Sequence, residues 1–262
     1  MSYQVVILLC YCLETFGGIF HSSAYKLIML ATPELLKKFA LFKDLSDEDL
    51  KYLCSKSLLE RHARRSVILS AGIREDRVCM LFEGRLQGVD FTIDGKEVGL
   101  YFVEPGDYCG ELCVFDQGAQ TEHVIALNST VVVLFSAETI RTVAEQNPKI
   151  MLALGGKLAS RVRQMATQRS LLSLPNVLQR VCSQLWLLIP NAEHGSTRTI
   201  EIKNLPTHME IAIMLNLSRE TITRVFQQLQ KRQIVSRTGQ NRLVIEDASA
   251  LRQIADGSKD ES

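Results

Sequence analysis

The sequence predicts an α+β protein with an N-terminal antiparallel β-roll, a long helix and a C-terminal winged helix-turn-helix. Three observations lead to this fold class. From Ser66 onward, short runs rich in Val, Ile and Phe are punctuated by glycine. After Asn147-Pro148, apolar residues recur at alternating intervals of three and four. Two short amphipathic segments then meet at Asn216 and are followed by a hairpin pattern.

Charge is distributed unevenly along the chain, although the formal net charge of its 262 residues is only +1. Residues 66–125 carry eleven acidic and four basic side chains, whereas residues 203–242 carry seven basic and two acidic ones. This asymmetry indicates an acidic module joined to a basic module that attracts anions.

The seven cysteines do not indicate a disulfide framework, because their number is odd and their spacing is irregular. We therefore expect buried thiols in a reducing cytoplasm. Cys10 and Cys12, and Cys109 and Cys113, do not make paired C-x-x-C motifs, so we predict no metal site. No Ser/His/Asp constellation or paired-carboxylate pocket indicates an enzyme, and we predict no catalytic residue.

Residues 1–32 are predicted to be an extension, either partly disordered or the product of a start that is not the native one. The apolar run from Val5 to Leu13 is too short to span a membrane. No Lys or Arg precedes it, as one would in a signal peptide. Met29 opens a segment that looks like a natural beginning. We expect little function before it and no membrane partner.

Residues 33–145 predict two short helices followed by the β-roll. Ser46 is placed to cap the second helix, whose acidic first turn suits the helix dipole. Asp94-Gly95 between two apolar runs is a strong hairpin signal. The expected helices and closing strands are Pro33–Phe39, Ser46–Ser55, Val124–Leu127 and Thr130–Phe135.

Residues 146–173 are predicted to form the long helix, which Asn147-Pro148 separates from a preceding short one. Its apolar residues follow a coiled-coil seam of about two heptads. The helix can bury this seam against the roll or against a second copy, and the pattern leaves both options open. The predicted seam residues are Met151, Leu154, Leu158, Val162 and Met165.

Residues 174–250 predict the winged helix-turn-helix. Thr207 is placed to cap its first helix and Ser218 its second. Asn216 lies at the corner, where Asn enters the left-handed region at little cost. Strands at 234–237 and 242–245 form the wing. Residues 251–262, which are small, polar and charged from Asp256 onward, are expected to be a disordered tail.

The second helix of this motif has its apolar residues on one face, which leaves Arg219, Glu220 and Arg224 exposed near its start. Arg can donate two hydrogen bonds to guanine, and Glu can accept one from cytosine. Because a carboxylate repels phosphate, Glu220 favours base reading over general phosphate binding. The alternative is an ordinary surface helix whose charges are only solvated.

The DNA backbone contacts that we expect come from both parts of the motif. Arg237 and Arg242 on the wing can lie along phosphates, although plain solvated arginines fit the pattern equally well. The full set of expected backbone-contacting residues is Thr207, Ser218, Thr221, Arg237 and Arg242.

Four motifs make the chain resemble the CRP/FNR family of bacterial transcription regulators over about residues 33–245. They are Phe82-Glu-Gly84, Pro105-Gly-Asp107, Gly110-Glu-Leu-Cys-Val-Phe-Asp-Gln-Gly118 and Ser218-Arg-Glu-Thr-Ile-Thr-Arg224. The resemblance implies a roll like a cyclic-nucleotide-binding domain and a dimerisation helix that makes a parallel homodimer. It also implies that Arg219, Glu220 and Arg224 read a palindromic TGTGA-like site in double-stranded DNA, and that RNA polymerase is a partner.

The family's nucleotide pocket is matched only in part. Gly110, Glu111 and Leu112 are present, but the family's Arg-Ser pair for the cyclic phosphate falls on Thr121 and Glu122. Replacing a charge-assisted fork by a carboxylate opposes an anionic ligand. The residues that contact adenine in the family align near Met165. We therefore expect that cyclic AMP does not bind in the usual pose.

Several functional alternatives stay open. The alternatives for the effector are a cyclic nucleotide (cyclic AMP or cyclic di-GMP), a fatty-acid-like signal, or no ligand at all, so no cofactor is certain. An architectural DNA-binding protein without an effector fits the same motifs. A nucleotide-gated catalytic or transport protein would share only the roll, and the chain has no kinase motif or phosphate loop to support it.

Overall fold

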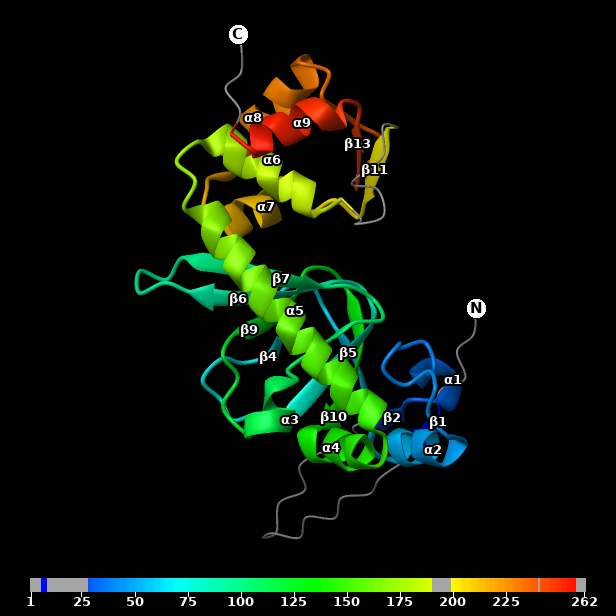
Figure 1. The fold of residues 1–262 in the computed structure, drawn as a ribbon. Helices are drawn as coiled ribbons and strands as arrows, with labels where there is room; N and C mark the ends of the chain where they lie inside the picture. The colour runs from blue at the N-terminus through cyan, green and yellow to red at the C-terminus, as the bar shows by residue number, and fades with distance from the viewer. Residues whose placement is uncertain (1–5, 9–27, 190–198, 240, 258–262) are drawn as a thin grey trace, which may run out of the picture. The chain divides into compact units, whose positions relative to one another are not determined.

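The computed structural model describes residues 6–8, 28–189, 199–239 and 241–257, and Figure 1 shows its ribbon. The chain forms two compact units. The first comprises residues 1–90 and 101–160, and the second comprises residues 91–100 and 161–262. The long helix α5 (Pro148–Leu172) begins in the first unit and ends in the second.

Two sheets form the predicted β-roll. One has six strands in the order β1-β2-β3-β10-β5-β8, and the other has four in the order β4-β9-β6-β7. The predicted hairpin at Asp94-Gly95 joins β6 to β7, where Thr92 N donates to Lys96 O over 3.0 Å. The strand bounds are β1 Val6–Leu8, β2 Ile28–Leu30, β3 Leu58–His62, β4 Val67–Leu69, β5 Arg77–Glu83, β6 Leu86–Phe91, β7 Glu97–Val103, β8 Tyr108–Cys109, β9 His123–Ala126 and β10 Thr130–Ser136.

Both faces of the central strand β10 are covered, which explains its uninterrupted apolar sequence. Val132 and Leu134 pack between the two sheets. Val133 and Phe135, on the opposite face, belong to a second core beneath the helices. Because side chains alternate along a strand, one apolar run serves both cores of the roll.

The helices of the roll are α1 (Pro33–Leu36), α2 (Asp47–Lys56), α3 (Leu112–Asp116) and α4 (Ala137–Gln146). The Ser46 hydroxyl accepts from Asp49 N over 3.1 Å, which confirms its predicted cap. Ile150 and Leu154 of α5 pack into the same core as α1, α2 and α4.

The predicted extension of residues 1–32 is wrong for its last residues. Strand β2 joins the six-stranded sheet, where Met29 pairs with Leu59. Ala31 is buried, and its backbone N donates to the Ser57 hydroxyl over 2.8 Å. Residues 28–32 therefore complete the roll, because their backbone groups have partners in it. Residues 1–5 and 9–27, with most of the early apolar run, lie outside the described residues.

The second unit contains the winged helix-turn-helix. Its helices are α6 (Val177–Leu187), α7 (His208–Leu215), α8 (Arg219–Lys231) and α9 (Ala248–Ala255). Its sheet has the order β11-β13-β12, with bounds Ile200–Lys203, Arg242–Ile245 and Val235–Arg237. The predicted wing is β12 and β13, and β11 adds a strand that we did not predict.

The predicted disordered tail of residues 251–262 is wrong for its first part, because α9 packs beside α6 in the ribbon (Figure 1). Leu251 and Ile254 are buried in the core of this unit. Arg252 lies over the ring of Trp186, 5.6 Å from its centroid. An apolar pair three residues apart is enough to dock one short helix on an existing core. Residues 258–262 lie outside the described residues.

Candidate nucleic-acid interface and effector pocket

Local hydrogen bonds build the corner between α7 and α8 as predicted. Thr207 and Glu210 form a capping box at the start of α7. Asn216 ends that helix in the left-handed region, with φ 52° and ψ 48°. The Ser218 hydroxyl then accepts from Thr221 N over 3.1 Å and caps α8. These contacts confirm three predictions about local structure.

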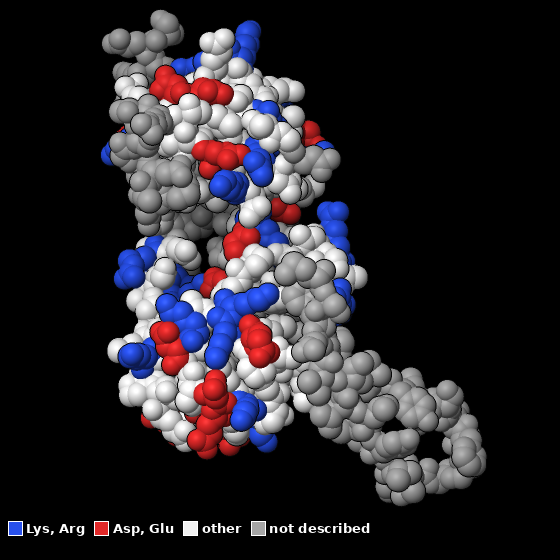
Figure 2. All heavy atoms as spheres, turned by 90° about the vertical axis from the view of Figure 1, so that its right-hand side faces the viewer, with Lys and Arg blue, Asp and Glu red and all other residues white. Residues whose placement is uncertain are grey.

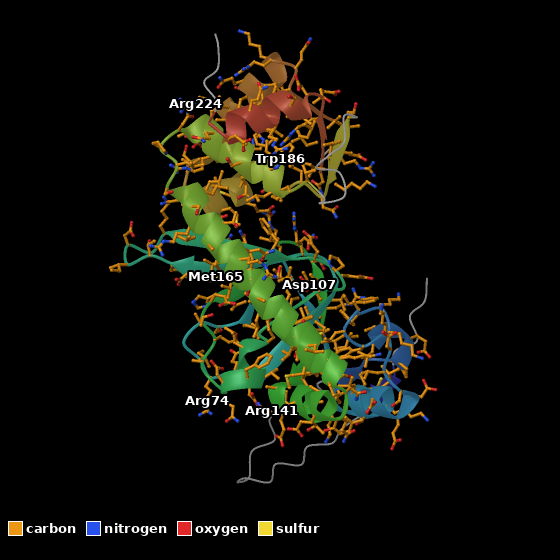
Figure 3. All side chains as sticks on the ribbon, in the orientation of Figure 1. Arg74, Asp107, Arg141, Met165, Trp186 and Arg224 are labelled. Atoms are coloured by element: carbon orange, nitrogen blue, oxygen red, sulfur yellow. The ribbon has the colours of Figure 1, made fainter. Side chains whose placement is uncertain are left out.

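Helix α8 presents its charged residues to solvent because its apolar face is fixed in the core. Ile222, Val225, Phe226 and Leu229 are buried. Arg219, Glu220 and Arg224 are exposed and line one shallow depression with Thr223. Figure 3 labels Arg224, which belongs to α8. The three predicted base-reading residues therefore share one accessible surface.

The carboxylate of Glu220 is held in its charged form. Hydrogen bonds to its own backbone N–H and to the Ser218 side chain, with the nearby charges of Arg219 and Arg224, lower the pKa of Glu220 from its ordinary value. A charged carboxylate at this place can accept from a base amino group and would repel a phosphate.

The two wing arginines have partners within the chain. Arg242 pairs with Glu201 of β11, its Nη1 lying 3.2 Å from Oε1. Arg237 donates from Nη2 to Nε2 of His208 over 2.7 Å. Both arginines remain exposed. Their phosphate contacts stay a prediction, and His208 is a residue of this surface that the sequence analysis missed.

In the roll, Gly110 of the predicted effector pocket lies close against Arg77 and Gln120. It has φ +80°, and a Cβ there would lie 2.5 Å from Arg77 O and 3.3 Å from Gln120 Nε2. Glu111 follows it and is fully buried. The Cys113 thiol contacts Gly110 O at 3.0 Å, and burial is the main reason that the pKa of Cys113 rises to about 11. This cysteine is therefore a protonated, structural thiol.

The exposed Thr121 and the buried Glu122 form a polar cluster with the partly buried Tyr101. Glu122 is only 5% exposed, and its Oε1 accepts from the Tyr101 hydroxyl over 2.5 Å. Its other oxygen accepts from the Thr121 hydroxyl. A Cβ on Gly88 would lie 2.6 Å from the Tyr101 ring, so glycine makes room for that ring. Tyr101 and Gly88 could not be predicted from the sequence, because no local pattern links them to Glu122.

The predicted seam of α5 needs a correction. Leu154 is fully buried in the roll core, and Met151 packs against the same core. Leu154 therefore cannot contact a second copy, because the roll core already encloses it, whereas Met151 is only partly buried against that core. Val162 and Met165 are 66% and 64% exposed, and Leu152 is 76% exposed. Met165 lies in the second unit, and its place in an effector pocket stays a prediction.

Two family models match the chain, one over the roll and one over the helix-turn-helix that follows it. Residues 59–147 match the cyclic nucleotide-binding domain, and residues 179–254 match the Crp-like helix-turn-helix domain. The chain belongs to the CRP/FNR family. It is accordingly a transcription regulator of the CRP/FNR type, a class of DNA-binding proteins that are not enzymes.

Relatives and solved structures agree with this membership. The chain is 26% identical over 202 residues to the cAMP-activated global transcriptional regulator CRP of Pasteurella multocida, covering 76% of this chain and 95% of that one. CooA of Carboxydothermus hydrogenoformans has a TM-score of 0.68 at 18% identity, covering 86% and 100%. The c-di-GMP responsive regulator CLP of Xanthomonas campestris has a TM-score of 0.60 at 18% identity, covering 77% and 99%. The two structures support the fold alone.

The described part of the chain brings no three His, Cys, Asp or Glu side chains together as a metal site. None of its helices has both the length and the apolar character that crossing a membrane requires.

Proposed function

We propose that this CRP/FNR protein is a homodimer that binds a palindromic, TGTGA-like site in double-stranded DNA. The observation that carries the proposal is the start of α8, where Arg219, Glu220 and Arg224 are exposed together above a buried apolar face. Figure 2 shows basic and acidic side chains interspersed over the face in view. With a net charge of +1, selectivity must come from local contacts rather than from a uniformly basic surface.

A homodimer fits the exposed face of α5. Leu152, Ala159, Val162 and Ala166 are exposed and follow one another at intervals of seven, three and four. This spacing places them on one stripe that can pair with a second copy in a coiled-coil manner. Two copies related by a two-fold axis would present two α8 helices to half-sites one turn of DNA apart. We expect such a regulator to act in the cytoplasm and to have RNA polymerase as a partner.

The effector domain is proposed not to bind cyclic AMP in the family's usual pose. The family's Arg-Ser pair would fall on Thr121 and Glu122, and Glu122 is buried and bonded to Tyr101. A cyclic phosphate there would meet a carboxylate in place of a guanidinium. Cyclic di-GMP, another small effector, or regulation without a ligand stay as alternatives.

Fluorescence anisotropy on a labelled duplex with inverted TGTGA-type half-sites tests the proposal. A scrambled duplex at the same salt concentration is the control, because salt alone changes all affinities. We expect tight binding to the specific duplex that cyclic AMP does not change. Equal affinity for both duplexes would refute the DNA site. Binding that appears only with cyclic AMP would refute the proposal for the pocket, and a response to cyclic di-GMP alone would identify the effector.

A further inference from the structure

Three elements of the DNA-binding unit meet at His208. This residue begins α7 and is half-buried. Its ring packs on Phe226 of α8, with 4.6 Å between centroids. Its Nδ1 lies 2.9 Å from the Thr223 hydroxyl of α8, and its Nε2 lies 2.7 Å from Arg237 Nη2 on the wing strand β12.

The hydrogen bonds of this cluster can run in only one direction. A guanidinium is always a donor, so Nε2 of His208 must accept and carries no proton. The imidazole is then neutral with its proton on Nδ1, which donates to the Thr223 hydroxyl. That hydroxyl in turn donates to Arg219 O over 2.9 Å. The chain of hydrogen-bond donors therefore runs from Arg237 on the wing to Arg219, the first residue of α8.

We propose that neutral His208 is a positioning residue that holds the wing arginine Arg237 in register with the base-reading end of α8. The proposal rests on the DNA-binding function proposed above. Arg237 is exposed and gives one Nη2 bond to His208. The guanidinium has five N–H donors, so others can reach a phosphate. Arg219 lies at the other end of the same cluster. The DNA phosphate contact of Arg237 and the base contact of Arg219 would therefore share one rigid support.

The arrangement depends on the charge of the imidazole. The charged groups that face it are Arg219 from α8 and Arg237 from β12, while Glu210 of α7 is engaged in the capping box. Burial, followed by Arg237 and Arg219, lowers the pKa of His208 below its ordinary value of 6.5. The neutral form, and the bond from Arg237, are therefore present above that value and are lost as the pH falls. Protonation would put an N–H on Nε2 toward a guanidinium.

A double-mutant cycle on the specific duplex tests this role. Arg237→Ala should weaken binding about tenfold and reduce the slope of log affinity against log salt by about 0.9, the effect of one phosphate contact. His208→Ala should cost a similar factor, and the double variant should bind no more weakly than Arg237→Ala. Losses that multiply in the double variant would overturn the proposal.

Milder substitutions test the same role of His208 without relying on His208→Ala. Thr223→Val removes the hydroxyl that accepts from Nδ1 and should weaken binding in the same direction, whereas the matched variant Thr223→Ser keeps the hydroxyl and should recover most of the affinity that Thr223→Val loses. His208→Gln can still accept from Arg237 but does not titrate. Wild-type affinity should fall as the pH drops through the pKa of His208, which lies below the ordinary 6.5, and His208→Gln should lack this fall. Identical pH profiles would contradict the mechanism.

The free protein separates this inference from the proposed function. ¹⁵N NMR of the imidazole at neutral pH should show the proton on Nδ1, and a proton on Nε2 would overturn the inference whatever the DNA result. If the tautomer is correct but the specific and scrambled duplexes bind equally, the DNA site has failed while the internal contact stands.

Discussion

Leu152 and Leu154 lie two residues apart on α5, and truncating each to alanine should affect a different property. We expect Leu152→Ala to weaken dimerisation and Leu154→Ala to destabilise the roll. Leu154 is fully buried in the roll core, so Leu154→Ala should destabilise that unit by about 2–5 kcal/mol. Leu152 is 76% exposed, so Leu152→Ala should change the stability of a monomer by less than about 0.5 kcal/mol. The pair therefore separates a residue of the roll core from a residue of the proposed dimer stripe.

The effect of Leu152→Ala on dimerisation follows from its exposed area. Burying a whole Leu side chain contributes about 1.5–3 kcal/mol, and about three quarters of this side chain is available. Both copies lose it in a symmetric dimer, so the loss is about 2.3–4.5 kcal/mol, or a roughly 40- to 2000-fold weaker dimer. Sedimentation equilibrium measures this change, with Leu154→Ala as the matched variant.

Two optical signals report the stability change separately. The single Trp186 packs against the core of the second unit, so its fluorescence follows that unit, whereas far-UV circular dichroism follows both. Urea unfolding of Leu154→Ala should shift the circular dichroism transition and leave the fluorescence transition of Trp186 nearly in place. The assignment of the two faces of α5 would be refuted if Leu152→Ala kept the dimer dissociation constant of the wild type. It would also be refuted if Leu154→Ala left the urea midpoint unchanged.

Three further predictions concern the DNA-binding unit. Arg224→Ala should weaken binding to the cognate duplex by about 1–3 kcal/mol, and Glu220→Ala should relax the base preference. Fluorescence anisotropy on a panel of half-site variants measures both effects. An equal loss of affinity on all duplexes would exclude base reading by Arg224. Ser218→Ala removes the α8 cap and should lower the free energy of unfolding by about 1 kcal/mol in urea titrations followed by Trp186 fluorescence, whereas Ser218→Asp should retain it. Deleting residues 248–262 should destabilise the same unit strongly, because Leu251 and Ile254 are buried, while deleting only residues 258–262 should not; equal midpoints for the two truncations would restore the idea of a disordered tail.

The sequence predicted those features that depend on interactions within a few residues. Thr207, Asn216 and Ser218 each act on neighbours up to four positions away, so local chemistry was sufficient. Strand β11 was missed because it depends on β13, where Ile200 pairs with Ile245 across a long stretch of chain. Helix α9 was missed because its own pattern is short and its stability comes from packing against α6.

The seam of α5 shows a different limit of sequence reasoning. Apolar residues occur on two faces of this helix, and their spacing alone does not say which face the roll covers. The burial of Leu154 and the exposure of Leu152 decide it. Contacts between distant residues, such as Arg237 with His208, were likewise beyond reach, since no periodicity relates a wing strand to the first residue of α7.

The polar cluster in the roll is best understood as a set of mutually dependent residues. Glu122 alone would be a costly buried carboxylate, but the Tyr101 and Thr121 hydroxyls both donate to it. The Tyr101 ring can take up this place only because residue 88 is glycine, since a Cβ there would lie 2.6 Å from the ring. Restoring an Arg-Ser pair at positions 121 and 122 would therefore remove the acceptor of the Tyr101 hydroxyl and leave the ring in place. The proposed departure from the family's phosphate site would thus involve residues on three separate segments and not a single changed contact.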